Sequence, residues 1–235
     1  MSVLKGNEKA RYVRKMFGRI APRYDMLNRI MTVGQDVRWR KEAVRKLGIT
    51  ENALLLDAGT GTGDIAREIS KQYPQVRVVA CDFTPEMVLI GKNRSKNKQI
   101  DWVIADAMNL PFKKDSFSGV ISGFLLRNVP DVNVAIAEQY RLLMASGRIV
   151  ALDTTPPKPG FLRPFVEFHL HYIIPFLGKI IAGDAEAYKY LPDSTENFLR
   201  AEVLAERMME AGFRKVAFVR RMLDTMAIHW GVKPE

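Results

Sequence analysis

The stretch LLLDAGTGTGDIA, residues 54–66, decides the fold of this chain. The apolar run 53–57 predicts a buried strand, and the pattern after the turn predicts a helix over about 64–72. Three glycines at alternate positions separate them. Glycine lets the backbone turn tightly and lets a ligand come close to it. A strand, a glycine-rich turn and a helix in this order indicate the first unit of an α/β domain with a ligand site at the turn.

The glycine spacing argues against a phosphate ligand. A dinucleotide-binding loop needs its third glycine at position 64, but the chain has Asp64 there, whose carboxylate would repel a phosphate. No Gly-Lys-Ser/Thr follows, so a P-loop is excluded. The favoured ligand lacks phosphates and has a positive centre, as S-adenosylmethionine does. We expect its sulfonium and amino group near Asp57 and Asp64, and its carboxylate at the N–H groups of the loop around Gly59 and Gly61.

Downstream, short apolar runs alternate with helical stretches, which is typical of a doubly wound parallel sheet with helices on both faces. The last two runs have only Met222 between them and should form an antiparallel pair at one edge of the sheet. The sequence therefore predicts a Rossmann-like α/β fold with a seven-stranded, mostly parallel sheet and an antiparallel edge strand. The predicted strands are 53–57, 76–81, 101–105, 118–126, 148–153, 214–221 and 223–230. The predicted helices are 8–20, 36–47, 64–72, 85–94, 135–144 and 198–211.

Acidic residues stand at the ends of three successive predicted strands. Asp57 ends the first, Asp82 ends the second, and Asp106 follows the third. The carboxyl ends of parallel strands form the edge where α/β sheets bind ligands. Asp82 is placed to accept both ribose hydroxyls, and Asp106 to accept the adenine amino group with Ala107 beside the ring. The three acids together predict a nucleoside site.

The composition describes an ordinary globular chain. It has 235 residues, of which 47% are hydrophobic and one is cysteine, Cys81. A single cysteine excludes an internal disulfide framework and a cysteine-cluster metal site, so we expect a cytoplasmic protein with no metal. The charged N-terminus has no apolar signal region. The apolar segment 161–183 is interrupted by two prolines and by charged residues, which argues against a membrane span.

The positive charge is concentrated at the N-terminus. Of the net charge of +10, residues 1–48 carry thirteen Lys/Arg and four Asp/Glu. The periodicity over 8–20 predicts an amphipathic helix. We therefore divide the chain into a basic helical arm or lid, 1–48, and a catalytic domain, 49–235, with an apolar cover over the substrate site at 161–197. A basic arm can contact RNA or anionic lipid, and the charge alone does not choose between them.

Three longer motifs carry a resemblance to a known family. The chain resembles the class I S-adenosylmethionine-dependent methyltransferases, and among them the ubiquinone/menaquinone biosynthesis C-methyltransferases, over nearly its full length. The motifs are YDMLNRIMTVGQDVRW (24–39), FLLRNV (124–129) and DAEAYKYL (184–191). The chain departs from the family pattern at Leu27, Thr32, Asp36 and Leu125, at RLLMASG (141–147), and at Asp153-Thr154-Thr155.

The resemblance implies cofactor contacts at Thr62, Asp82, Asp106, Ala107 and Gly123, where the family commonly has serine in place of Gly123. It implies C-methylation of a reduced, prenylated quinone ring, either 2-demethylmenaquinol to menaquinol or the ubiquinone counterpart. Membrane contact through the basic arm would then bring the enzyme to its substrate, and self-association of the chain stays open.

The chemistry of such a methylation suggests roles for the remaining candidates. Electron density on the attacked carbon rises when the neighbouring hydroxyl is deprotonated, and Arg127 can hold the resulting phenolate while Asn128 sets the geometry. Arg127 cannot be the base, since arginine stays protonated. A structural alternative is an ion pair between Arg127 and Asp131. The candidate ring-side partners are Tyr24, Asp25, Tyr188 and Tyr190, with His169 and His171 as further titrating groups.

Three other functions compete with this one. An RNA methyltransferase would use the same basic charge, but the fourth strand ends in FLLRN rather than in an Asn/Asp-Pro-Pro-aromatic box, and Cys81 lies on the second strand. A methyltransferase acting on another small phenol or a lipid remains open. The altered RLLMASG segment motivates a cofactor-binding but inactive subunit, against which the intact Asp82, Asp106, Arg127 and Asn128 argue.

Overall fold

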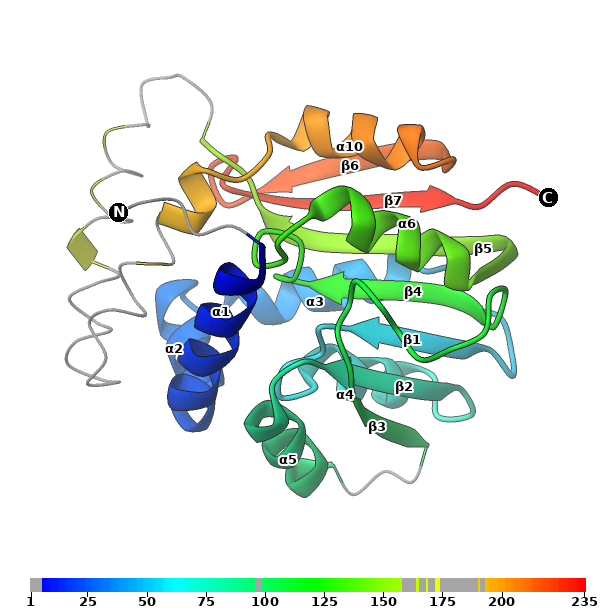
Figure 1. Ribbon diagram of the computed structural model, residues 1–235, viewed down its shortest axis with the longest axis horizontal. Coiled ribbons are helices and arrows are strands. Elements are labelled where there is room, and N and C mark those ends of the chain that lie inside the picture. Colours follow the sequence, from blue (N-terminus) through cyan, green and yellow to red (C-terminus); the bar gives the residue numbers. More distant parts are fainter. Residues whose placement is uncertain are drawn as a thin grey trace.

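The structure is a computed structural model that describes residues 6–95, 99–157, 164, 168, 172–173, 190 and 193–235. Its strands are β1 (Leu54–Ala58), β2 (Arg77–Asp82), β3 (Ile100–Ile104), β4 (Phe117–Gly123), β5 (Leu143–Thr154), β6 (Arg214–Arg221) and β7 (Met226–Val232). They form one seven-stranded sheet in the order β3-β2-β1-β4-β5-β7-β6 (Figure 1). The strands from β3 to β5 pair in parallel, and β7 is antiparallel to β5 and to β6. The predicted fold is confirmed, with the reversed strand β7 one place inside the edge.

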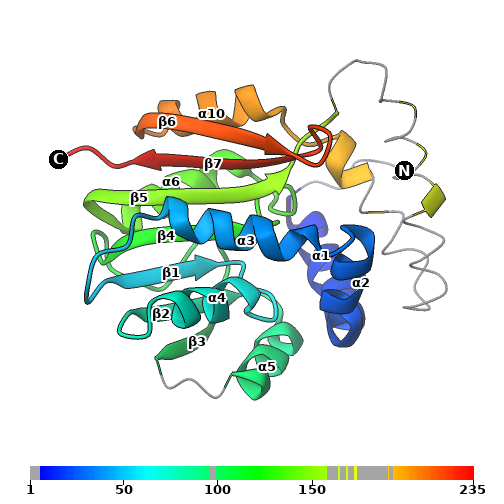
Figure 2. The ribbon, with the colours of Figure 1, turned by 180° about the vertical axis from the view of Figure 1, so that it is seen from behind.

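Helices cover both faces of the sheet. α3 (Gln35–Lys46) and α4 (Asp64–Gln72) pack on one face, and α6 (Val132–Leu142) and α10 (Ala201–Glu210) on the other (Figures 1 and 2). Each helix turns an apolar stripe to the sheet, as Ile65, Ala66 and Ile69 do in α4. The result is one apolar core on each face of the sheet.

The N-terminal helices lie beyond the carboxyl ends of β1 and β4 (Figure 1). α1 (Gly6–Ile20) continues through a 3-10 turn (Ala21–Arg23) into α2 (Tyr24–Met31), and α5 (Pro85–Arg94) follows β2. α1 confirms the predicted amphipathic helix, whereas α2 was not predicted. Pro22 stands in the first turn of the 3-10 helix, where a missing N–H breaks no helical hydrogen bond, so it redirects the chain without ending its helical path.

Several predicted boundaries are wrong: the strand predicted over 118–126 ends at Gly123, and the strand predicted over 148–153 begins at Leu143. Asp131 caps the N-terminus of α6. The helix ends at Leu142 because the chain enters β5 at Leu143, so the predicted helix 135–144 extends too far. β7 begins at Met226 rather than at residue 223. The backbone there turns through residues with left-handed φ, at Met222, Leu223 and Asp224, which cannot belong to a strand.

Most of the predicted cover, 161–197, lies outside the described residues, and the division of the chain at residue 48 stays a prediction. Phe168 and Tyr172 are described; they are exposed, and their rings stack with centroids 5.2 Å apart. Within the described part of the chain, no helix is long and apolar enough to cross a membrane.

Candidate active site

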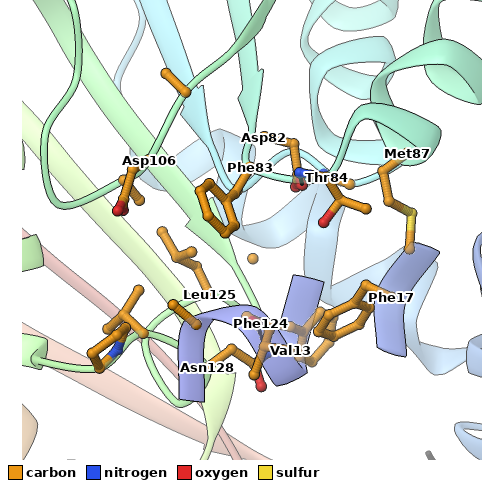
Figure 3. Close-up of a pocket in the computed structure, with 18 of the residues that line it drawn as sticks. Val13, Phe17, Asp82, Phe83, Thr84, Met87, Asp106, Phe124, Leu125 and Asn128 are labelled. Atoms are coloured by element: carbon orange, nitrogen blue, oxygen red, sulfur yellow. Dashed lines mark hydrogen bonds between the residues drawn. The ribbon is translucent and has the colours of Figure 1, made fainter. Parts of the chain in front are cut away.

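A pocket opens at the carboxyl ends of β1, β2, β3 and β4, with α1 as its cover. Figure 3 shows Asp82 and Asp106 on one side and Leu125 and Asn128 on the other. The strand ends contribute Gly59, Gly61, Asp82, Phe83, Thr84, Ala105, Asp106, Ala107, Gly123, Phe124 and Leu125, and α1 contributes Ala10, Val13 and Phe17. The register of the parallel strands aligns these ends at one edge of the sheet.

Two features shape the glycine loop: the close approach of a neighbouring side chain, and the left-handed backbone conformation of its glycines. Gly59 has φ +67°, and a Cβ there would lie 2.7 Å from Cδ1 of Leu125. Leu125, which stands where the family pattern has glycine, therefore packs directly on this loop. Gly61 has φ +57° and donates its N–H to Oδ2 of Asp82 over 2.8 Å. The loop is thus held between the β2 and β4 strand ends.

Asp82 is a partly buried acid that lines the pocket. Its Oδ1 accepts the Thr84 N–H and its Oδ2 the Gly61 N–H, both at 2.8 Å. Burial raises the pKa of this carboxyl, and the backbone donors oppose that shift. Each carboxylate oxygen has more than one lone pair, so Asp82 can still accept two ribose hydroxyls.

Asp57 lies beneath the glycine loop and is not among the residues that line the pocket. It is fully buried, and its Oδ2 accepts the Thr60 hydroxyl at 2.6 Å and the Ala66 N–H at 3.0 Å. Burial raises the pKa of Asp57 to about 7. The structure therefore places Asp57 where it joins the loop to the start of α4, rather than against a ligand.

Asp64, the second acid expected near the positive centre of the cofactor, belongs to an ion-pair cluster. Its carboxylate lies 2.6 Å from Arg67, 3.2 Å from Arg29 and 3.4 Å from Arg40. Asp36, which has no exposed surface, pairs with Arg29 and Arg40 in the same cluster. These three arginines offset the charge of Asp64, so the expected attraction from this residue is weakened.

A smaller cleft extends the pocket along the glycine loop. Tyr24, Gly59, Gly61, Gly123 and Phe124 line both spaces, which therefore adjoin each other. Thr62 lines only the smaller cleft, where its hydroxyl donates to the carboxylate of Asp25 at 2.7 Å. Asp25 also pairs with Arg94. The structure thus places Asp25 beside the cofactor loop.

Arg127 stands on the turn after β4, and its main partner is Asp153 at the end of β5. The Nη1–Oδ1 distance is 2.7 Å, and the Arg127 N–H reaches Oδ2 of the same carboxylate at 3.3 Å. The guanidinium also lies 5.0 Å from the centre of the Phe124 ring. The predicted ion pair with Asp131 is wrong, because the Asp131 carboxylate accepts N–H groups of Asn133 and Val134 as the cap of α6.

A second pocket, of about 480 Å³, adjoins the first and shares Val129 and Pro130 with it. Its lining is Lys9, Tyr12, Leu126, Arg127, Val129, Pro130, Val132, Tyr190, Asp193, Ser194, Asn197, Phe198 and Leu199. Asn128 links the two pockets, because it lines the first and accepts the hydroxyl of Tyr190, from the second, at 3.1 Å. The Arg127–Asn128 turn therefore forms part of the wall between them.

The phenols at this wall are neutral near pH 7. Tyr24 is partly buried, and desolvation of its hydroxyl raises its pKa against the opposing effect of Arg127 and Arg40. Burial likewise raises the pKa of Tyr190 to about 12. Tyr24 can donate a hydrogen bond to an oxygen of a ligand, whereas the Tyr190 hydroxyl donates to Asn128 and can accept one. Tyr188, His169 and His171 lie outside the described residues.

The sequence comparisons agree with this geometry. The family model for the ubiE/COQ5 methyltransferase family matches residues 4–233. The chain belongs to this family. Its cofactor is S-adenosylmethionine, and the pocket fits that molecule: the glycine loop leaves room along the backbone, and Asp82 and Asp106 offer acceptors for a nucleoside.

Named relatives of this methyltransferase match along most of their length. The "Ubiquinone/menaquinone biosynthesis C-methyltransferase UbiE" of Desulfotalea psychrophila is 48% identical, covering 94% of this chain and 90% of that protein. The "Demethylmenaquinone methyltransferase" of Thermus thermophilus is 38% identical, covering 93% of this chain and 100% of that protein.

Among solved structures, the complex of the Haloferax volcanii Trm112 methyltransferase activator with a putative methyltransferase matches with a TM-score of 0.67 at 16% identity, covering 93% of this chain and 98% of that one. This likeness shows the fold.

Most predicted cofactor residues of the methyltransferase come together in one pocket. Gly59, Gly61, Asp82, Asp106, Ala107 and Gly123 line it. The predicted arm or lid, 1–48, did not name the residues of α1 that line the pocket, although the apolar face of the predicted helix at Val13 and Phe17 was the available signal. In the part of the chain that the structure describes, no group of three or more metal-binding side chains occurs.

Proposed function

We propose that this methyltransferase transfers a methyl group to a ring carbon of a prenylated quinol, converting 2-demethylmenaquinol to menaquinol or carrying out the equivalent step toward ubiquinone. The printed names of the relatives support this class of acceptor. The observation that carries the proposal is the Arg127–Asn128 turn, which forms part of the wall between the cofactor pocket and the second pocket.

The second pocket is suited to a quinol ring with an apolar chain. Leu126, Val129, Phe198 and Leu199 supply apolar walls, and Arg127 and Tyr190 supply polar groups. A few oriented polar groups in an apolar pocket are typical of a site for such a ligand. The predicted apolar cover would add to these walls.

Not every hydrogen-bond donor of Arg127 is used by a described residue. Its Nη1 is used by Asp153, while Nε is buried and has no hydrogen-bond partner among the described residues, so an acceptor oxygen would reach Nε only with a shift of the side chains around it. A quinol oxygen that loses its proton to water becomes a phenolate, and a guanidinium beside it stabilises that charge as it forms. Bound S-adenosylmethionine supplies the methyl group on its sulfonium. Arg127 keeps its own proton and so acts through charge and position.

Asn128, Tyr24 and Tyr190 would fix the geometry of the ring. The Asn128 side chain is held at both ends, since its Nδ2 donates to the Phe124 carbonyl over 2.7 Å and its Oδ1 accepts the Tyr190 hydroxyl. A fixed side chain at the pocket wall aligns the acceptor carbon with the methyl group at little entropic cost. Asp25 would act on the cofactor loop through Thr62, and Tyr188 stays a candidate ring-side partner.

We also propose that the enzyme contacts an anionic membrane surface. The supporting feature is an open groove between α1 and α5, lined by Arg11, Arg14, Lys15, Gly18, Arg19 and Glu86. Four cations and one carboxylate make this groove attractive to acidic lipid headgroups. Such a contact would bring the second pocket to a substrate that resides in the bilayer.

The acceptor can be tested directly. The purified protein is incubated without oxygen with S-adenosylmethionine and either 2-demethylmenaquinol or the benzoquinol equivalent, and the product is identified by mass spectrometry. We expect one added methyl group on one of the two rings, and the same gene should restore methylated quinone in a cell that lacks its quinone C-methyltransferase.

An Arg127→Lys variant tests the role of the guanidinium in this assay. It keeps the charge but loses Nε, so kcat should fall about 100-fold while cofactor affinity is unchanged. Arg207→Lys, at an exposed ion pair on α10, is the matched control and should behave as wild type. Absence of methylation of either quinol, with cofactor binding intact, would contradict the proposed acceptor; methylation of simple phenols instead would favour the alternative.

A further inference from the structure

α1 faces both pockets at once. Ala10, Val13 and Phe17 cover the cofactor pocket, and Lys9 and Tyr12 line the second pocket. A shift of this helix would carry Val13 and Phe17 away from the cofactor pocket and Lys9 and Tyr12 away from the second. The position of α1 therefore affects the pockets on both sides of the wall formed by the Arg127–Asn128 turn.

Lys9 is the residue that joins α1 to this turn. Its Nζ donates to the backbone carbonyl of Arg127 at 2.9 Å and to that of Val129 at 2.8 Å. These carbonyls flank Asn128. Burial lowers the pKa of Lys9, while Asp153 opposes that shift. Hydrogen bonds from a charged donor are stronger than those between neutral groups.

The same turn is held on its other side by groups that do not belong to α1. Asp153 accepts the Arg127 N–H, and the Asn128 N–H reaches the Leu125 carbonyl at 2.8 Å. The Asn128 side chain donates to the Phe124 carbonyl. Lys9 therefore adds contacts to the two carbonyls that flank Asn128, and it does so from the helix that covers the cofactor pocket.

We propose that Lys9 is a positioning residue that couples the seating of α1 over the cofactor to the alignment of Arg127 and Asn128 toward the second pocket. With α1 displaced, the carbonyls of Arg127 and Val129 lose this ammonium and the turn is held from one side only. With α1 seated, the turn is clamped from both. The acceptor site is then fully formed only when the cofactor pocket is closed.

Hydrogen–deuterium exchange tests this coupling without any acceptor. In the wild type, S-adenosylmethionine should slow amide exchange in α1, in the glycine loop and in residues 125–130. In Lys9→Met, it should still slow exchange in the glycine loop but no longer in residues 125–130. Lys9→Arg keeps the charge and the reach, so it should restore much of that protection. Lys92→Met, an exposed lysine on α5, is the control and should match the wild type.

Kinetics adds a second readout, which rests on the proposed function. Lys9→Met should lower kcat with the quinol by about 10- to 100-fold, with a smaller effect on cofactor affinity and with partial rescue in Lys9→Arg. If residues 125–130 of the wild type are not protected by the cofactor, or if Lys9→Met keeps both that protection and its kcat, the proposal is overturned. The exchange experiment needs only the cofactor, so a wrong acceptor would not affect its outcome.

Discussion

Asp57 is a carboxyl group without contact with water, and its acid–base behaviour follows from that. The pKa of Asp57 lies at about 7 in the folded protein because burial disfavours the charge. In the unfolded chain it returns to the ordinary value of 3.8. Between these values the folded state holds more protons than the unfolded state, so Asp57 makes the free energy of unfolding fall as pH rises.

Removing this titration should flatten the pH dependence of stability. We expect that Asp57→Asn loses part of the decline in unfolding free energy between about pH 4 and pH 7, measured by urea denaturation at several pH values. Asp101→Asn, at an exposed ion pair on β3, should keep the wild-type slope. An Asp57→Asn variant with the full wild-type slope would mean that the carboxylate is already charged in the folded state.

Leu125 and Phe124 show how side chains shape the cofactor loop. Leu125 packs on Gly59, and Phe124 has a left-handed φ of +60°, which is unusual for a residue with a side chain. Two guanidinium groups lie near the centre of the Phe124 ring, that of Arg127 at 5.0 Å and that of Arg40 at 5.6 Å. These two cation–π contacts offset part of the strain of this conformation.

At the scale of elements, the turn after β4 depends on β5. Asp153, on β5, is 1% exposed and neutralises Arg127, which is 8% exposed. Asp131 is exposed and only caps α6. A buried charge that loses its partner costs far more than a helix that loses its cap.

Substitution of Asp153 should therefore lower the free energy of unfolding much more than substitution of Asp131. We expect Asp153→Ala to lower the free energy of unfolding by about 3–5 kcal/mol, and Asp131→Ala by about 1 kcal/mol. Denaturant unfolding of both variants measures the difference. Equal losses would show that the Arg127–Asp153 pair contributes no more to stability than one cap does.

At the scale of the whole molecule, the excess positive charge of the N-terminal residues lies at one end of the fold. The basic residues of α1 lie at the end of the molecule that holds the carboxyl ends of the parallel strands and both pockets (Figure 1). A membrane bound by this surface would face the pocket end rather than the opposite edge of the sheet.

Binding to lipid vesicles tests this orientation. Each cation near an anionic surface contributes about 1 kcal/mol, so changing both Arg11 and Lys15 to Gln should weaken binding to phosphatidylglycerol vesicles about 30-fold. The control neutralises Lys113 and Lys114, exposed residues before β4 at the opposite edge. Equal loss in both variants would indicate general charge attraction, and absence of vesicle binding by the wild type would contradict the membrane contact.

The sequence by itself determined the α/β fold, the glycine loop and the acids at the strand ends. These features depend on local periodicity and on residue type at a strand end, which the linear pattern contains. The parallel sheet then had to place Asp82 and Asp106 at one edge. The family motifs added the Arg127–Asn128 turn.

Only the tertiary structure decided which partners these residues have. Arg127 pairs with Asp153, 26 positions away, rather than with nearby Asp131, and Lys9 reaches a carbonyl 118 positions away. Asp57 lies beneath the loop, and three arginines surround Asp64. Such contacts depend on how whole elements pack together, and no periodicity within one element specifies which distant charge will meet another.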